Sequence, residues 1–95
     1  MIISFRGQLA EDLYLDRVSA VSRRFPQDLK AIAVRKLQYL NAAARLSDLK
    51  VPPGNRLEAL KGTLKGYHSI RINDQWRIVF RWDDGAREVQ IVDYH

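Results

Sequence analysis

Hydrophobic residues recur with helical spacing in the first half of the chain. Leu9 and Leu13 lie one turn apart and predict a first helix over residues 7–16. A second helix is predicted to begin at Pro26, because proline suits the first turn of a helix and the acidic Asp28 follows it. The apolar positions of this second helix are Leu29, Ile32, Ala33, Leu37, Leu40 and Ala44.

The second half of the chain changes to an alternating pattern that is typical of β-strands. Two prolines and a glycine predict a loop over residues 50–55, and "ND" and "DDG" mark turns later in the chain. The runs between these signals predict strands over residues 56–60, 67–72, 75–82 and 87–95, with a further short strand over residues 2–5.

The predicted strand over residues 75–82 separates its side chains by chemistry. One face carries Trp76, Ile78, Phe80 and Trp82, and the other carries Arg77, Val79 and Arg81. We therefore expect an α+β fold, in which two N-terminal helices pack on the apolar face of a mainly antiparallel, twisted sheet. Arg77 would be exposed on the opposite face, so that replacing it by alanine would change stability little.

Length and composition fit a single domain over residues 1–95. The first residues form no apolar run long enough for a secretory signal or a membrane span, so we expect a cytoplasmic protein with no membrane partner. The formal net charge is +5, and residues 56–81 hold six basic residues against two acidic ones. Such a basic segment permits binding to a polyanion.

Cations and aromatic rings are interleaved in this basic segment. The cations are Lys61, Lys65, Arg71, Arg77 and Arg81, and the rings belong to Tyr67, His68 and Trp76. Single-stranded nucleic acids bind such surfaces, because cations neutralise phosphates and flat rings stack on bases. The candidate RNA contacts are Lys65, Tyr67, His68, Arg71 and Arg81. The alternative is an ordinary solvated sheet face, with Lys61 as a surface lysine and His68 as a packing residue.

Asp93, Tyr94 and His95 end the last predicted strand and form a second candidate site. Imidazole titrates near neutral pH, and Asp93 shares one strand face with His95. Such groups beside a cationic surface suit general acid–base catalysis on a bound phosphate. Two histidines and no cysteine exclude a zinc site of ordinary spacing, so we expect no metal and no cofactor.

Four motifs in residues 57–95 resemble the HigB branch of the RelE-type toxins of bacterial type II toxin–antitoxin systems. They are Leu-x-x-Leu-Lys-Gly at 57–62, Gly-Tyr-x-x-x-x-Ile at 66–72, Trp-Arg-Ile-x-Phe at 76–80 and Asp-Tyr-His at 93–95. The N-terminal half agrees with this family in its layout of a short strand, two helices and a proline-containing loop. The resemblance implies a fold similar to that of microbial ribonucleases.

The same resemblance implies that the protein cleaves mRNA on the 70S ribosome, at the codon in the A site. The residues implied in catalysis are Lys61, Arg77, Asp93, Tyr94 and His95. The implied partner is a HigA-like antitoxin with a helix-turn-helix, through which alone the toxin would reach operator DNA. One position departs from the family, because many members have a histidine where this chain has Glu58. Glu58 either accepts a proton in place of that histidine, or the position is dispensable, or the enzyme is less active.

The implied chemistry needs no metal, because the ribose 2′-OH attacks the adjacent phosphorus. Arg77 and Lys61 would stabilise the charge on the phosphorane oxygens. The base would be Asp93, His95 or Glu58, and the acid would be His95 or Tyr94. Two other interpretations fit the same residues: a non-catalytic RNA- or ribosome-binding module, and a degenerate toxin retained as an antitoxin-binding partner.

Overall fold

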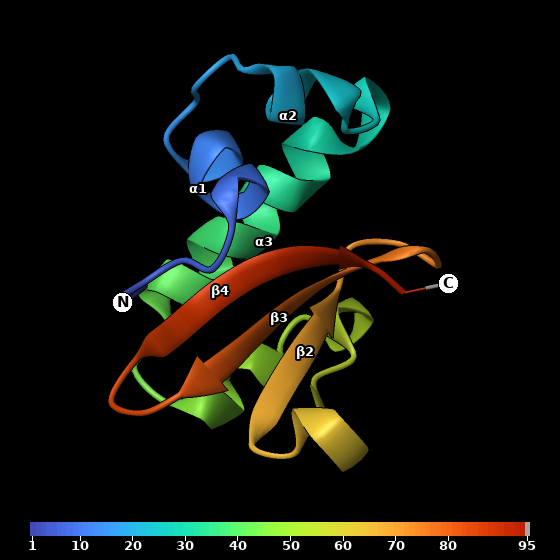
Figure 1. Cartoon of the computed structure of the whole chain (residues 1–95). Coiled ribbons are helices and arrows are strands. Elements are labelled where there is room, and N and C mark those ends of the chain that lie inside the picture. Colours follow the sequence, from blue (N-terminus) through green and yellow to red (C-terminus); the bar gives the residue numbers. More distant parts are fainter. Residues whose placement is uncertain (95) are drawn as a thin grey trace.

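A computed structural model describes residues 1–94 of the chain and arranges them as a sheet with helices on one face (Figure 1). The strands are β1 (Glu58–Ala59), β2 (Tyr67–Arg71), β3 (Trp76–Trp82) and β4 (Ala86–Asp93). They lie in the order β1-β2-β3-β4, and every neighbouring pair is antiparallel. Hairpin connections of this kind bring residues from the whole second half of the chain onto one continuous surface.

Three α-helices and four 3₁₀ turns complete residues 1–94. The helices are α1 (Gln8–Tyr14), α2 (Ala20–Arg24) and α3 (Lys30–Ala42). The turns are η1 (Gln27–Leu29), η2 (Leu46–Lys50), η3 (Pro53–Asn55) and η4 (Gly62–Leu64). None of these helices has the length and apolar character that crossing a membrane requires.

The hydrophobic core lies between the sheet and the helices α1 and α3. From the sheet, the fully buried residues include Ile70, Ile78, Phe80 and Val89, and from the helices Leu13, Ala33, Leu37 and Leu40. Trp76 lies at the margin of this core, where its ring meets the ring of Phe25 edge-on at 5.0 Å between centroids. Burial of these side chains fixes which face of each strand is turned inward.

The α+β class and the antiparallel sheet are confirmed, and the two predicted N-terminal helices are matched in part. The first predicted helix corresponds to α1. The second begins at Lys30 rather than at Pro26, because the chain first forms η1, and α3 ends at Ala42. Ile32, predicted on the apolar face of that helix, is 37% exposed.

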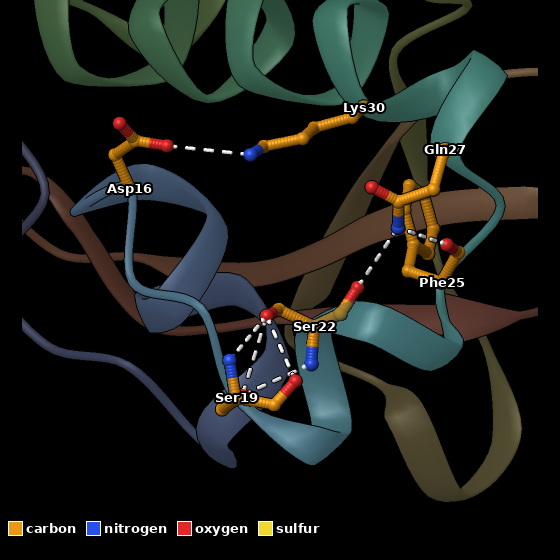
Figure 2. Close-up of polar contacts among 6 residues, drawn as sticks. All are labelled: Asp16, Ser19, Ser22, Phe25, Gln27 and Lys30. Atoms are coloured by element: carbon orange, nitrogen blue, oxygen red, sulfur yellow. Dashed lines mark hydrogen bonds and ion pairs between the residues drawn. The ribbon is translucent and has the colours of Figure 1, made fainter.

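The short helix α2 was absent from the sequence prediction. Ser19 caps it: the Ser22 N–H donates to Ser19 Oγ at 3.0 Å, and the Ser19 N–H donates to Ser22 Oγ at 2.8 Å (Figure 2). Such reciprocal bonds satisfy donors that a helix start leaves unpaired. Figure 2 also shows Lys30 at the start of α3 reaching Asp16 beyond the end of α1, with 3.3 Å between Nζ and Oδ1.

Two predicted strands are shorter in the structure than expected. Residues 2–5 run parallel to β4 but form isolated bridges, Ile2 to Ala86 and Phe5 to Val89, instead of a continuous strand. The strand predicted over residues 56–60 is reduced to β1, because Arg56 has left-handed backbone angles (φ 46°, ψ 57°) at the end of η3. β1 is therefore a short edge strand next to a long, structured loop.

Candidate nucleic-acid interface

The outer face of the sheet, turned away from α1 and α3, holds most of the candidate residues. Strand alternation and the pairing register place on it Glu58, Leu60, Tyr67, Ser69, Arg71, Arg77, Val79 and Arg81. Leu60 and Val79 are buried on this face, outside the main core. The outer face is thus a small apolar centre bordered by charged and hydroxyl side chains.

Arg77 is the most highly connected side chain on the outer face. Its Nη1 donates to Ser69 Oγ at 2.9 Å and to the Arg56 carbonyl oxygen at 3.4 Å, and its Nη2 donates to Glu58 Oε1 at 3.3 Å. The guanidinium carbon lies 5.4 Å from the centre of the Tyr94 ring. The side chain is only 11% exposed, so its guanidinium is held in one position.

This arrangement leaves part of the Arg77 guanidinium available. Of its five N–H groups, both on Nη1 and one on Nη2 have acceptors, whereas Nε and the second Nη2 hydrogen have none in residues 1–94. Arginine binds phosphate oxygens through pairs of N–H groups, with geometric specificity. Arg77 can therefore accept a phosphate without losing its contact with Ser69.

The end of β4 lies beside Arg77. Asp93 pairs with Trp76 across the sheet, and its carboxylate accepts a bond from Gln75 Nε2 at 3.0 Å. The Tyr94 N–H donates to the Gln75 carbonyl at 2.6 Å, which places its ring against Arg77. The structure thus brings Tyr94 together with Arg77 on the outer face, whereas the pairing register places Asp93 on the inner face with Trp76.

His95 lies outside the described residues. Its predicted role therefore stays a prediction.

Lys61 and Lys65 flank the turn η4 at the rim of the outer face. Both side chains are exposed, and within residues 1–94 neither has a carboxylate partner. The structure places them as exposed cations close in the chain to the strand that carries Glu58. Their role in binding RNA stays a prediction.

A second network at the other end of the outer face joins Tyr67, Arg81 and Glu88. The Tyr67 hydroxyl donates to Glu88 Oε1 at 3.0 Å, and Arg81 Nη1 donates to Glu88 Oε2 at 3.3 Å. The Arg81 guanidinium also lies 5.8 Å from the centre of the Tyr67 ring. Glu88 was missed by sequence reasoning, because it reaches this face through an irregularity in the β3–β4 pairing and has φ of 51°.

His68 lies on the inner face, away from the other candidate RNA contacts. Its ring stacks on Phe80 with 6.2 Å between centroids, and its Nδ1 is buried without a hydrogen-bond partner in residues 1–94. Trp76 also faces inward, against Phe25. The cations and rings that alternate in the sequence therefore do not share one surface. On the outer face, Tyr67 and Tyr94 supply the rings.

Each of the three candidate arginines has a carboxylate of the same chain beside it. Glu58 pairs with Arg77, Glu88 with Arg81 and Asp74 with Arg71. The hydrogen bond and charge of Arg71, and more weakly the charge of Arg56, hold the pKa of the Asp74 carboxyl below its usual value. A polyanion that binds here has to share the arginines with these carboxylates or displace the carboxylates.

Other kinds of site are not supported by the described residues. No cluster of three or more histidine, aspartate or glutamate side chains suited to a metal occurs in residues 1–94. An open depression of about 550 Å³ lies on α3, lined by Gln27, Lys30, Ala31, Val34, Arg35 and Gln38. It includes none of the candidate residues, so this depression is separate from the interface.

Comparisons with known proteins show the family of the chain. Residues 3–95 match the family model described as RelE-like toxin of type II toxin–antitoxin system HigB. The chain is 41% identical to Toxin HigB-1 of Vibrio cholerae over 95 residues, which is 100% of this chain and 98% of that relative.

Two solved structures share the fold. YafQ from E. coli aligns with a TM-score of 0.59 and 20% identity over 99% of this chain and 92% of that chain. The YoeB–YefM complex from Staphylococcus aureus aligns with a TM-score of 0.54 and 21% identity over 100% of this chain and 98% of that chain.

Proposed function

Because the chain belongs to the HigB-like toxins of type II toxin–antitoxin systems, a RelE-like family, we propose that it is a ribosome-dependent mRNA endonuclease. It acts in the cytoplasm on the codon in the ribosomal A site and so inhibits translation. The observation that carries the proposal is the immobilised Arg77 guanidinium, with unused donors, beside the ring of Tyr94.

The proposed reaction is an attack by the ribose 2′-OH on the adjacent phosphorus. The O2′–P bond forms, the bond to the 5′-oxygen breaks, and the products carry a 2′,3′-cyclic phosphate and a 5′-hydroxyl. Arg77 binds the phosphate oxygens as their charge grows, and Lys61 approaches from the rim. In this scheme both act on the phosphate through their charge, and other groups transfer the protons.

Two proton transfers accompany this attack. A base removes the proton of the 2′-OH, and an acid supplies one to the leaving 5′-oxygen. Asp93 and His95 are proposed as bases, and Tyr94 or His95 as the acid. The contact between Tyr94 and Arg77 supports this grouping, because it places the phenol beside the group that binds the phosphate.

Glu58 has a different relation to the site. Its carboxylate pairs with Arg77 at 3.3 Å, close enough to exchange this partner for a bound phosphate. Of the alternatives for this position, we propose that Glu58 occupies the phosphate-binding arginine in the free protein. Proton transfer then rests on the group formed by Asp93, Tyr94 and His95.

The remaining RNA contacts are proposed along the outer face. Tyr67 offers a ring for stacking, and Arg81, Arg71 and Lys65 offer charge for phosphates. His68 is left out, because its ring is packed on Phe80. The ribosome would hold the mRNA in the geometry for in-line attack, which so shallow a surface cannot impose alone.

The proposed protein partner is a HigA-like antitoxin with a helix-turn-helix. The fold shared with the YoeB–YefM complex supports an antitoxin as partner. The toxin would associate with operator DNA only through that antitoxin.

Induced expression in bacteria tests the proposed function. The wild-type chain should stop growth and deplete full-length mRNA, whereas Arg77→Lys should not, because lysine keeps the charge without the paired N–H groups. Arg24→Lys, an exposed position on α2, is the matched control and should remain toxic. If cells that express the wild-type chain at the level of the variants grew without any defect, the proposal would be contradicted.

A further inference from the structure

The irregular pairing of β3 and β4 brings a carboxylate onto the outer face, at the end opposite to Tyr94. Val79 pairs with Gln90 and Arg81 with Arg87, so two residues of β4 lie opposite a single residue of β3. Such a bulge bends the strand and can redirect a side chain. Glu88 is one of these two residues, and its side chain is 37% exposed. It has no part in the reaction proposed above.

The backbone of Glu88 is held in a left-handed conformation, with φ of 51°. Residues with a side chain rarely adopt such angles, and the strain persists only where the surrounding contacts determine the conformation. The N-terminal segment supplies those contacts: the Glu88 N–H donates to Ser4 Oγ at 2.9 Å, and the Val89 N–H donates to the Ser4 carbonyl at 3.0 Å. The side chain of Glu88 therefore starts from a fixed backbone.

Two neighbouring side chains also hold the carboxylate of Glu88. The Tyr67 hydroxyl donates to Oε1 at 3.0 Å, and Arg81 Nη1 donates to Oε2 at 3.3 Å. An ionised carboxylate has about four acceptor positions, about two on each oxygen, so each oxygen can accept one more hydrogen bond. Within residues 1–94 these remaining positions have no donor. Glu88 thus offers two acceptors side by side.

Arg81 places donors next to these acceptors. Of its five N–H groups, only one has an acceptor in the part of the chain from residue 1 to 94. Its side chain is 56% exposed, so a ligand can reach the other donors, and enough of them remain for a phosphate as well. An ordinary ion pair on a sheet surface would require neither the left-handed backbone of Glu88 nor the bond from Tyr67.

Guanine is the base whose edge matches this arrangement of acceptors and donors. Its N1–H and N2–H groups are neighbouring donors that one carboxylate can accept together, and its O6 beside them accepts from an arginine. Adenine and cytosine each present one amino group beside a ring acceptor, and uracil presents a single N–H. Guanine alone can therefore fill both acceptor positions of Glu88 and one donor of Arg81.

We propose that Glu88 and Arg81 form a base-specificity site, which binds the Watson–Crick edge of an unpaired guanine in the RNA strand on the outer face. Tyr67 is a positioning residue, because its hydroxyl holds the carboxylate. Arg81 lies four residues from Arg77 along β3, or about 13 Å at the rise of a strand. Base recognition and binding of the cleaved phosphate therefore use different groups. That the strand is mRNA rests on the proposed function, whereas the preference for guanine does not.

Binding of short single-stranded RNAs tests the proposal without requiring cleavage. Three oligouridine strands would carry one central guanosine, inosine or adenosine. The wild-type protein should bind the guanosine strand at least about fivefold more tightly than the adenosine strand, which is the lower end for a bidentate base contact. The inosine strand should lie between them, because inosine keeps N1–H and O6 but lacks the amino group at N2.

Glu88→Gln should bind the three strands with nearly equal affinity, because an amide oxygen and an amide nitrogen cannot both accept an N–H group. The matched control is Asp83→Asn, which removes the same charge from an exposed residue directly after β3 and should keep the wild-type order. Equal binding of the guanosine and adenosine strands by the wild type would overturn the proposal. A preference for guanosine that Glu88→Gln retains would overturn it too.

Two further readings keep the test decisive. If Glu88→Gln does not fold, Tyr67→Phe, which keeps the ring and removes the hydroxyl bonded to Glu88, should reduce the preference for guanosine, and an unchanged preference would overturn the proposal. A preference for guanosine in a protein that does not cleave mRNA would support the base site and contradict the nuclease. Cleavage on ribosomes without any preference for guanosine in binding would overturn the base site alone.

Discussion

The carboxylate of Glu58 lies 3.3 Å from the guanidinium of Arg77, so the arginine proposed to bind phosphate already holds an anion of its own chain. Glu58 is half exposed, whereas Arg77 is almost buried. The carboxylate can therefore swing into solvent while the guanidinium stays in place. We propose that binding of RNA begins with this exchange of partners.

Replacing Glu58 by glutamine should strengthen the binding of single-stranded RNA. Exposed ion pairs contribute about 0.2–1 kcal/mol, which corresponds to about a 1.4- to fivefold gain in affinity. Oligonucleotide binding to Glu58→Gln and to wild type at one salt concentration measures the effect. Glu11→Gln, which removes the same charge from α1, is the control. Lost cleavage with unchanged RNA affinity would instead identify Glu58 as the proton acceptor.

Arg77→Ala should abolish cleavage and also lower stability. The sequence-based expectation that Arg77 is exposed is wrong, because the side chain is 11% exposed. A larger loss of stability is therefore expected, since Ser69 Oγ, fully buried, would lose its donor. Leaving such a group unpaired costs about 1–3 kcal/mol. Urea unfolding measures the loss, and Arg81→Ala, with a side chain 56% exposed, is the comparison and should lose less. Equal losses would show that Arg77 is not held as described.

Asp74→Asn should lower stability at neutral pH but not in acid. The pKa of the Asp74 carboxyl is lowered by Arg71 in the folded chain, so its contribution is fully present above the ordinary value of 3.8. That contribution is lost as the pH falls through the lowered pKa. Thermal melting of both proteins from pH 6 to strong acid should converge at the acid end. A difference that stays constant with pH would mean that the Arg71 pair does not stabilise the fold.

Antitoxin binding should weaken as salt is added. Lys61 and Lys65 are exposed cations with no carboxylate partner in residues 1–94, and an inhibitor that covers the outer face would meet them with acidic groups. Screening shortens the reach of such attractions to about 8 Å at 0.15 M salt. Titration calorimetry over a salt series measures this. Constant affinity would indicate an apolar interface, for which Leu15 and Val18 are exposed on the helical side.

Much of the sheet was predictable because alternation is a local property. The inner position of Ile78 and Phe80 and the outer position of Arg77 follow from the pattern of β3 alone. The same rule applied to Ile70 would have placed His68 inside. The prediction grouped His68 with its neighbours by chemistry and not by its position in the alternation.

The remaining features depend on contacts that no local pattern encodes. Glu88 reaches Tyr67 through the irregular β3–β4 pairing, and one extra residue there changes which side chains face outward. The pair of Glu58 and Arg77 joins positions on two strands that are not neighbours in the sheet. Ser19 and Ser22 cap α2, but this helix is too short to contain an apolar repeat from which it could be predicted.

Cleavage of mRNA on programmed ribosomes tests the central claim most directly. Purified protein would be added to ribosomes that hold a defined mRNA with an empty A site, and the ends of the fragments would be analysed. The account predicts a cut within the A-site codon that leaves a 2′,3′-cyclic phosphate and a 5′-hydroxyl, with no cut of the same mRNA alone and none by Arg77→Lys or His95→Ala. Ribosome binding by the wild-type protein without any cut would contradict the account and leave a non-catalytic binding module.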